Sequence, residues 1–242
     1  MDRQERSSQV VRALNELRSL ILSGTFEAGD RLAETAISER LGLSRTPLRQ
    51  AMDRLVSEGL LERMETGGCR IARFTRDDII DAIELRGVLE GTAARLAAER
   101  GVVPEKAHQI RNVLDELDEA IRPDGFELRA YVRLNQRFHD LLAGLAGSAV
   151  IAREVDRANQ LPAASPSAFL QGHELIPDFR ENLRVAQAQH RSIFEAIEAR
   201  EGARAEALTR EHARIARVNL EYILNERPRL AEQVPGLALM QG

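Results

Sequence analysis

Apolar residues near the start of the chain recur every three or four positions, which is the spacing of amphipathic helices. Residues 10–22 predict a first helix that ends at Gly24, a residue type favoured at helix C-termini. Ile37 and Leu41 lie four positions apart, and Gly42 follows them. They predict a second, short helix that Gly42 ends.

The next segment predicts a third helix followed by a hairpin. Ser44 is a favourable N-cap, and the apolar residues after it recur at helical spacing. Two short strands, 60–64 and 70–72, then flank Gly67 and Gly68, a dipeptide typical of tight turns. Three helices and a hairpin in this order predict a winged helix-turn-helix domain.

The remaining chain carries the helical period almost throughout, and Thr75 and Asp78 form a T-x-x-D capping signal ahead of it. We expect helices at 77–100, 105–121, 127–145, 148–161, 179–200 and 203–226, with a seventh in 166–176 as an alternative. The predicted fold is therefore mainly α-helical. It has an N-terminal winged helix-turn-helix domain (1–73), an all-helical C-terminal bundle of six or seven helices (77–226) and a C-terminal tail (227–242).

Composition narrows the class of protein. Hydrophobic residues make up 43% of the 242 residues and aromatic residues only 4%, which suits helices packed through aliphatic side chains. Cys69 is the single cysteine, so no internal disulfide can form. The chain has no run of 18 apolar residues and no apolar leader, so we expect a cytoplasmic protein without a membrane partner.

The net charge of −4 is the sum of a net +1 over residues 1–73 and a net −5 over the rest. Neither part is strongly basic, so any binding of DNA must come from a few well-placed arginines. Arg45, Thr46 and Arg49 should lie at the exposed N-terminal end of the third helix, where a recognition helix meets bases. Arginine can bind guanine through two hydrogen bonds, and threonine suits phosphate.

Taken alone, two exposed arginines would be typical of any solvent-facing helix surface. The short helix before them and the wing after them favour DNA binding instead. In the wing, Gly67 and Gly68 permit close backbone approach to a groove, and Arg70 beside them can reach a phosphate.

Three of the five histidines fall on predicted inward faces of three different helices. These are His139, His190 and His212, whereas His108 and His173 are expected at the surface. A single histidine of this kind is usually a core residue with a hydrogen-bond partner. Three on separate helices favour a shared site, since imidazole is the commonest metal ligand, although their local spacing matches no standard zinc motif.

The first 73 residues resemble the GntR family of bacterial regulators. The resemblance implies that Arg31, Arg45 and Arg49 contact DNA, with help from Thr46 and the wing glycine. Ala28 departs from the family pattern, which often has proline there, and this should alter only the rigidity of the turn. The resemblance rests on G-T-F-E-A-G-D-R-L (24–32), L-S-R-T-P-L-R-Q-A (43–51), E-G-L-L-E-R (58–63) and the glycine wing.

Residues 77–226 resemble the FCD effector domain of the FadR-like branch of that family. Many such domains bind a divalent metal through one aspartate and three histidines, beside a pocket for a small carboxylate. The match implies His139, His190 and His212 as ligands, with Asn135 where the family usually has aspartate. The metal expected for this neutral set is zinc, with nickel or manganese as alternatives. The resemblance rests on residues 84–98, 135–142, 189–200 and 211–212.

Two residues are expected to bind the effector. Arg86 shares a helix face with Ile79 and Ile83 and should point into the bundle. Its guanidinium could clamp a carboxylate through two hydrogen bonds, or it could form an ion pair within the bundle. Asn219, which shares the face of His212, is the second expected contact.

The sequence therefore predicts a ligand-responsive regulator rather than an enzyme. We expect a homodimer that binds a two-fold operator in double-stranded DNA, with its affinity set by a small organic acid beside the metal. Two alternatives remain open. The three histidines could serve a helical metalloenzyme, although no general base lies near them in the sequence, or a pure metal sensor.

Overall fold

The computed structural model describes residues 3–170, 179–226, 234 and 236–241 of the chain. These residues divide into two compact units by their internal contacts. The first unit holds the described residues of Met1–Ile79, Gln160–Ala163 and Pro228–Gly242. The second unit holds those of Ile80–Asn159 and Ala164–Arg227.

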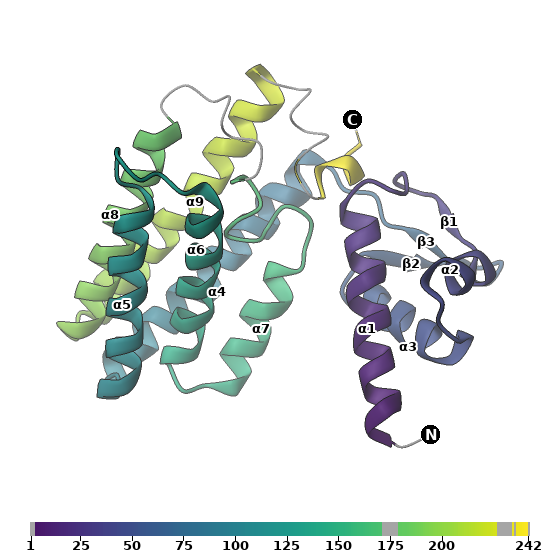
Figure 1. The fold of residues 1–242 in the computed structure, drawn as a ribbon, viewed down its shortest axis with the longest axis horizontal. Helices are drawn as coiled ribbons and strands as arrows, with labels where there is room; N and C mark the ends of the chain where they lie inside the picture. Colours follow the sequence, from purple (N-terminus) through teal and green to yellow (C-terminus); the bar gives the residue numbers. More distant parts are fainter. Residues whose placement is uncertain (1–2, 171–178, 227–233, 235, 242) are drawn as a thin grey trace. The chain divides into compact units, whose positions relative to one another are not determined.

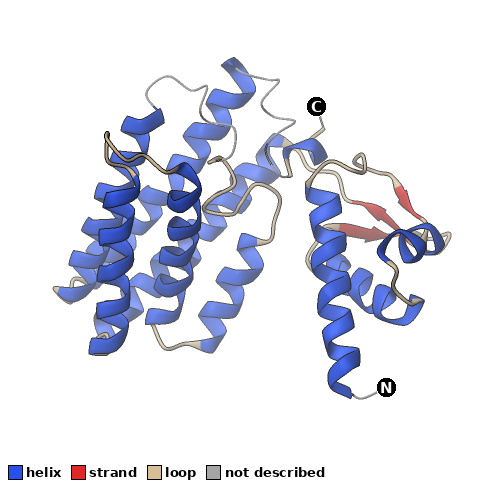
Figure 2. Cartoon of the chain, viewed as in Figure 1, coloured by secondary structure: helices blue, strands red, loops and turns tan. Residues whose placement is uncertain are grey.

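The first unit combines three helices with a small sheet (Figures 1 and 2). Its helices are α1 (Arg3–Leu22), α2 (Glu34–Leu41) and α3 (Arg45–Ser57). The strands β1 (Arg31–Leu32), β2 (Leu61–Arg63) and β3 (Cys69–Ile71) form an antiparallel sheet in the order β1-β3-β2. The sequence predicts β2 and β3, whereas β1 is a third strand that it does not predict.

The turn between α2 and α3 forms as the sequence predicts. Gly42 has a φ of 61°, and its N–H donates to the carbonyl of Glu39. This left-handed conformation is easy for glycine, which lets the chain change direction sharply between the two helices. Ser44 occupies the N-cap position of α3, as the sequence predicts, but its side chain makes no capping hydrogen bond. The first turn of α3 therefore has no side-chain acceptor on its free amides.

Residues far along the chain complete the core of the first unit. Leu239, in the short 3-10 helix η2 (Leu237–Leu239), is fully buried among side chains of α1, α3 and the sheet. The backbone N–H of Phe74 donates to the carbonyl of Leu239, and the N–H of Gly236 donates to that of Leu22. The N–H of Gln241 donates in turn to the carbonyl of Phe74. Residues 236–241 are thus hydrogen-bonded into the same unit as the helix-turn-helix.

Six helices form the described part of the second unit (Figure 1). They are α4 (Arg76–Arg100, in this unit from Ile80), α5 (Pro104–Ala120), α6 (Leu128–Leu145), α7 (Ala149–Asn159), α8 (Phe179–Glu198) and α9 (Gly202–Glu226). Each lies within two residues of its predicted bounds, and the mainly helical fold is confirmed. Of the alternative seventh helix, residues 166–170 form turns and 171–176 lie outside the described residues.

The start of α4 shows how the sequence specifies a helix end. The hydroxyl of Thr75 accepts from the N–H of Asp78 at 3.1 Å, and the Asp78 carboxylate accepts from the N–H of Thr75 at 2.7 Å. This reciprocal pair is the predicted capping box. It lowers the pKa of the Asp78 carboxyl, because the hydrogen bonds from Thr75 favour its charged form.

A single apolar core holds most of the second unit together. Its largest fully buried side chains include Tyr131 and Phe138 of α6 and Ile110 of α5. Helix α5 packs along α6, and α8 packs along α9. Within the described residues, no helix is both long and apolar enough to cross a membrane.

Candidate DNA interface and buried histidine site

Helix α3 buries one apolar face and exposes polar residues at its N-terminal end. Leu48, Met52 and Leu55 are buried, whereas Arg45 and Arg49 are exposed in the first turns. Thr46 is exposed beside Arg45. The three residues expected at DNA therefore share the solvent-facing N-terminal end of α3, where free backbone amides favour an anion such as phosphate.

The two arginines at the N-terminal end of α3 differ in their partners. The Nε of Arg49 donates to Glu34 of α2 at 2.7 Å, and its side chain is 64% exposed. Within the described residues, Arg45 has no ion pair. An exposed pair of this kind contributes little stability, so Arg49 can exchange Glu34 for another acceptor at small cost.

The wing brings two further arginines together. Arg31 on β1 is paired in register with Arg70 on β3, and both side chains are exposed. Arg31 reaches the carbonyl of Gly67 at 3.5 Å, and Arg70 pairs with Glu62 at 2.7 Å. Gly67 and its neighbour have φ values of 84° and 85°, as a tight hairpin turn requires. The unpredicted strand β1, which lies beside β3 (Figure 1), pairs Arg31 with Arg70 and so places it at the wing.

Three helices of the second unit bring three histidines to one buried point. His139 of α6, His190 of α8 and His212 of α9 are 1%, 0% and 7% exposed. One ring nitrogen of each lies within 4.8 Å of the others. The Nε2 atoms of His190 and His212 are 2.9 Å apart. The structure thus brings together the three histidines that the sequence analysis singles out.

Two further buried residues contact these rings. The sequence analysis names neither of them. Glu90 of α4 is 0% exposed and accepts from Nδ1 of His139 at 2.9 Å. Burial alone would raise the pKa of Glu90, but electrostatic attraction to His139 and Arg86 and the hydrogen bond with His139 hold it at about 2. Gln187, one turn before His190, faces Nδ1 of that ring through its amide oxygen at 3.1 Å.

Burial keeps two of the rings neutral. It lowers the pKa of His190 and that of His212 well below the ordinary 6.5, and the neighbouring rings lower both further. Neutral imidazole is the form that binds metals.

Asn135 lies on the same helix as His139 but is held by another segment. Its amide nitrogen donates to the hydroxyl of Ser167 at 3.2 Å and to the carbonyl of Pro166 at 3.4 Å. The carbonyl oxygen is therefore the only atom that Asn135 could offer to a metal.

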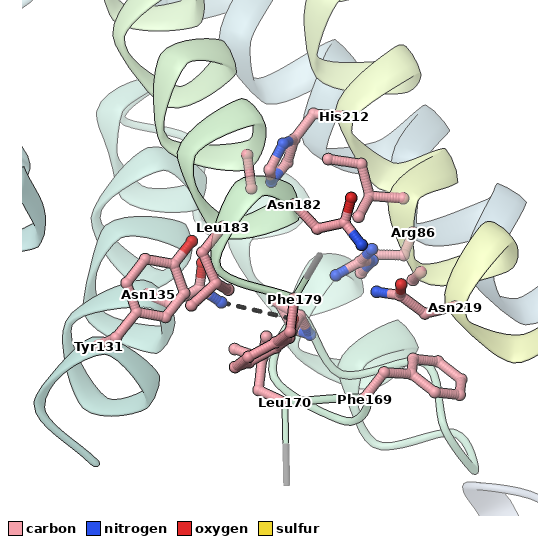
Figure 3. A pocket seen from close by; sticks show the side chains of 14 residues that line it. Arg86, Tyr131, Asn135, Phe169, Leu170, Phe179, Asn182, Leu183, His212 and Asn219 are labelled. Carbon is pink, nitrogen blue, oxygen red and sulfur yellow. Dashed lines mark hydrogen bonds between the residues drawn. The ribbon is translucent and has the colours of Figure 1, made fainter. Parts of the chain in front are cut away.

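A pocket opens beside the histidines, and Figure 3 shows the side chains that line it. Arg86 is 2% exposed and lies close to Asn219 and Asn182 at one end of the pocket. Asn135 and His212 also line the pocket, and the remaining lining is mostly apolar, namely Tyr131, Pro166, Phe169, Leu170, Phe179, Leu183, Ala186, Ile215 and Ala216. Its volume is about 40 Å³, room for a few water molecules or a small ligand.

The buried guanidinium of Arg86 is only partly satisfied by hydrogen bonds. One terminal nitrogen donates to the carbonyl of Ala213 at 3.4 Å, whereas Nε and the other terminal nitrogen are buried without partners. Glu90 attracts it electrostatically, but no carboxylate of the described residues lies within 4.0 Å of the guanidinium. The expected alternative of a close intra-bundle ion pair is therefore not formed in the described part of the chain.

Comparison with known proteins matches both units to families. Residues 9–71 match the model for bacterial regulatory proteins of the gntR family, and residues 81–214 match the FCD domain. The chain belongs to the GntR family of transcriptional regulators. Within that family, the match to the FCD domain confirms the FadR-like branch that the sequence resembles.

Several relatives of this GntR regulator span most of its length. It is 28% identical to the HTH-type transcriptional regulator YdhC of Bacillus subtilis, over 88% of this chain and 91% of that protein. It is also 28% identical to the HTH-type transcriptional repressor GlaR of Escherichia coli, over 81% and 88% of the two chains. A solved structure of E. coli McbR/YncC shares the fold, with a TM-score of 0.64, 18% identity and coverage of 90% and 98%.

These relatives and both families are transcriptional regulators, so the prediction that this GntR protein is not an enzyme is confirmed. The alternative of a helical metalloenzyme built on the three histidines is thereby set aside.

Proposed function

We propose that this GntR regulator binds a two-fold operator as a homodimer, and that a small organic acid beside a divalent metal in the helical unit sets its affinity for DNA. The observation that carries the proposal is Arg86, a buried cation with two unpartnered donors that lines the same pocket as His212. Buried donors without a hydrogen-bond partner are costly, and a ligand carboxylate would satisfy them.

The residues around the three histidines fit a metal. The Nε2 atom of His139 is buried without a hydrogen-bond partner, and it lies near the rings of His190 and His212. Metal-bound histidines commonly donate their other ring N–H to a carboxylate, and Glu90 lies in that position at Nδ1 of His139. Three imidazole nitrogens suit zinc or nickel better than manganese. The carbonyl oxygen of Asn135 or water would complete the set.

When bound, the metal would supply a positive charge and a position for one carboxylate oxygen of the effector. Arg86 would bind the effector through its free guanidinium donors. Asn182 and Asn219 would orient the polar end of the ligand, because their amides offer both donors and acceptors. The small volume and the apolar walls favour an acid with a short carbon chain.

The DNA-binding unit would read the operator through α3 and the wing. Arg45 and Arg49 would contact base edges, and Thr46 would contact phosphate. Arg31 and Arg70 lie on neighbouring strands at the wing and would bind phosphates of the DNA backbone beside the adjacent groove. Because bacterial DNA lies in the cytoplasm, this function places the protein there.

Metal analysis combined with gel shifts tests the proposal. A duplex selected with the protein from random DNA serves as operator, and its affinity is measured with zinc, with a chelator and with a panel of small mono- and dicarboxylic acids. We expect an acid to change the affinity only with zinc present. Arg86→Gln should abolish this response while zinc binding and basal DNA binding remain.

The variant His190→Ala should lose zinc and the response to acids together, whereas His108→Ala, which alters an exposed histidine, should keep both. A change of affinity with zinc alone, unaffected by any acid, would favour a pure metal sensor. Full response to acids in the Arg86→Gln variant would contradict the role of Arg86.

A further inference from the structure

Each of the three buried histidines has the carboxylate or amide group of another side chain behind its Nδ1 nitrogen. Glu90 faces His139 at 2.9 Å, Gln187 faces His190 at 3.1 Å, and Gln189 faces His212 at 3.0 Å. The tautomer of a neutral histidine is set by the partner of one nitrogen, and it determines whether the other can bind a metal. How firmly each of these groups is held therefore matters for the site.

The amide of Gln187 can have only one orientation. Its nitrogen donates to the carbonyl of Leu114 at 2.9 Å and to the carboxylate of Asp118 at 2.8 Å. A carbonyl and a carboxylate can only accept, so the amide nitrogen must be the atom that faces them. Its oxygen must then face His190, and Nδ1 of that ring must carry the hydrogen. Nε2 of His190 is left with a lone pair.

Glu90 acts on His139 in the same way. A carboxylate oxygen of Glu90 lies 2.9 Å from Nδ1 of His139, and a carboxylate accepts hydrogen bonds, so Nδ1 of His139 carries a hydrogen. The other oxygen of Glu90 is buried without a hydrogen-bond partner, so nothing in the described residues competes for this carboxylate.

Gln189 is different, because its amide has no second hydrogen bond among the described residues that would fix its orientation. The Nε2 atoms of His190 and His212 are 2.9 Å apart, a distance at which one must donate to the other. Since Nε2 of His190 carries a lone pair, the hydrogen belongs to Nε2 of His212. Gln189 must then turn its amide so that its nitrogen donates to Nδ1 of His212.

We propose that Gln187 and Glu90 hold His190 and His139 ready as ligands, whereas His212 is the ligand that switches. Building on the proposed metal site, the switch moves the hydrogen of His212 from Nε2 to Nδ1 when a metal binds, and Gln189 rotates to accept it. The ring loses one hydrogen and gains one, so it releases no net proton. Gln187 is a positioning residue, because it acts on the site only through His190.

Nitrogen NMR of the full-length protein tests this directly. With ¹⁵N in histidine only and a chelator present, long-range proton–nitrogen spectra should show the hydrogen of His190 on Nδ1 and that of His212 on Nε2. Zinc should then shift the hydrogen of His212 to Nδ1 and leave His190 unchanged. A hydrogen on Nε2 of His190, or on Nδ1 of His212 before zinc is added, would overturn the proposal.

Two variants separate the residues behind the rings. Gln187→Leu should release the tautomer of His190 and weaken zinc binding about 10- to 100-fold, the usual effect of losing such a partner. Gln189→Leu is the matched control, and it should leave the His190 signals unchanged. An unchanged His190 tautomer in folded Gln187→Leu would contradict the role of Gln187.

If Gln187→Leu does not fold, the spectra of the unaltered protein still test which nitrogen of each ring carries the hydrogen. Lack of zinc binding with the expected metal-free tautomers would overturn the proposed metal site and the switch, but not the fixed tautomers of His139 and His190. Zinc binding with an unaltered His212 would overturn the switch alone.

Discussion

Lowering the pH from 7.5 to 5.5 should destabilise the helical unit when no metal is bound. His190 and His212 are buried, and burial holds the pKa of each well below the 6.5 of an exposed histidine. In the unfolded chain both regain the ordinary value and take up protons below pH 6.5. The unfolded state then binds more protons than the folded state, so stability is present above pH 6.5 and is lost as the pH falls towards the folded pKa values.

The size of the effect follows from proton linkage. A group that stays neutral in the folded protein costs about 1.4 kcal/mol at one pH unit below its unfolded pKa. Two such groups lower the free energy of unfolding by up to about 3 kcal/mol at pH 5.5. That is a large share of the roughly 5–15 kcal/mol typical of a folded domain.

Tyrosine fluorescence offers a selective assay. The chain has no tryptophan, and its two tyrosines, Tyr131 and Tyr222, both belong to the helical unit. Urea unfolding in the presence of a chelator, followed at several pH values, therefore reports on this unit. The variant His190→Leu should lose about half of the pH dependence, whereas His108→Ala should keep it.

A free energy of unfolding that stays constant between pH 7.5 and 5.5 would refute the reasoning, because it would mean that both rings take up protons equally well in the folded state. The same pH dependence in His190→Leu as in the unaltered protein would assign the effect to other groups.

Three further predictions concern the first unit. Arg45→Ala and Arg49→Ala should each weaken operator binding by roughly 1–3 kcal/mol in a gel shift if they contact bases, and unchanged affinity in both would remove α3 as the recognition helix. Replacing Gly67 and Gly68 with valine should strain their positive φ values and lower DNA affinity while effector binding stays intact; untouched DNA affinity would exclude the wing from the interface. Leu239→Ala should destabilise this unit by about 2–5 kcal/mol, seen as faster hydrogen exchange in α1, and unchanged exchange would show that the cavity costs nothing.

Much of the fold could be predicted because the period of its apolar residues is regular. The six helices of the second unit follow that period, and the capping box of Thr75 and Asp78 marks where α4 begins. Strand β1 could not be predicted in this way, since two residues are too few to show an alternating pattern. Residue type correctly marks Ser44 as the N-cap of α3, but it does not determine whether the side chain forms the capping hydrogen bond, which is absent here.

The histidine site was predictable only in part, because some of its contacts leave no pattern in the sequence. Histidines on apolar faces stand out in a sequence, and His139, His190 and His212 do converge. A glutamate on a helix usually faces solvent, so Glu90 gives no signal of its own, although it follows Arg86 by one helical turn. The clamp on Gln187 depends on the carbonyl of Leu114 in another helix, and periodicity contains no information about such a contact.

The place of residues 236–241 in the first unit has a consequence for the order in which the protein is made. A ribosome synthesises the helix-turn-helix first and the helical unit next, and Leu239 follows only after both. At roughly 5–20 residues per second, the nascent DNA-binding unit waits on the order of ten to thirty seconds for its last core residue and for the backbone partner of Phe74. Every copy with a complete DNA-binding core therefore already carries the helical unit. An unfinished chain that lacks the helical unit also lacks the complete core of the DNA-binding unit.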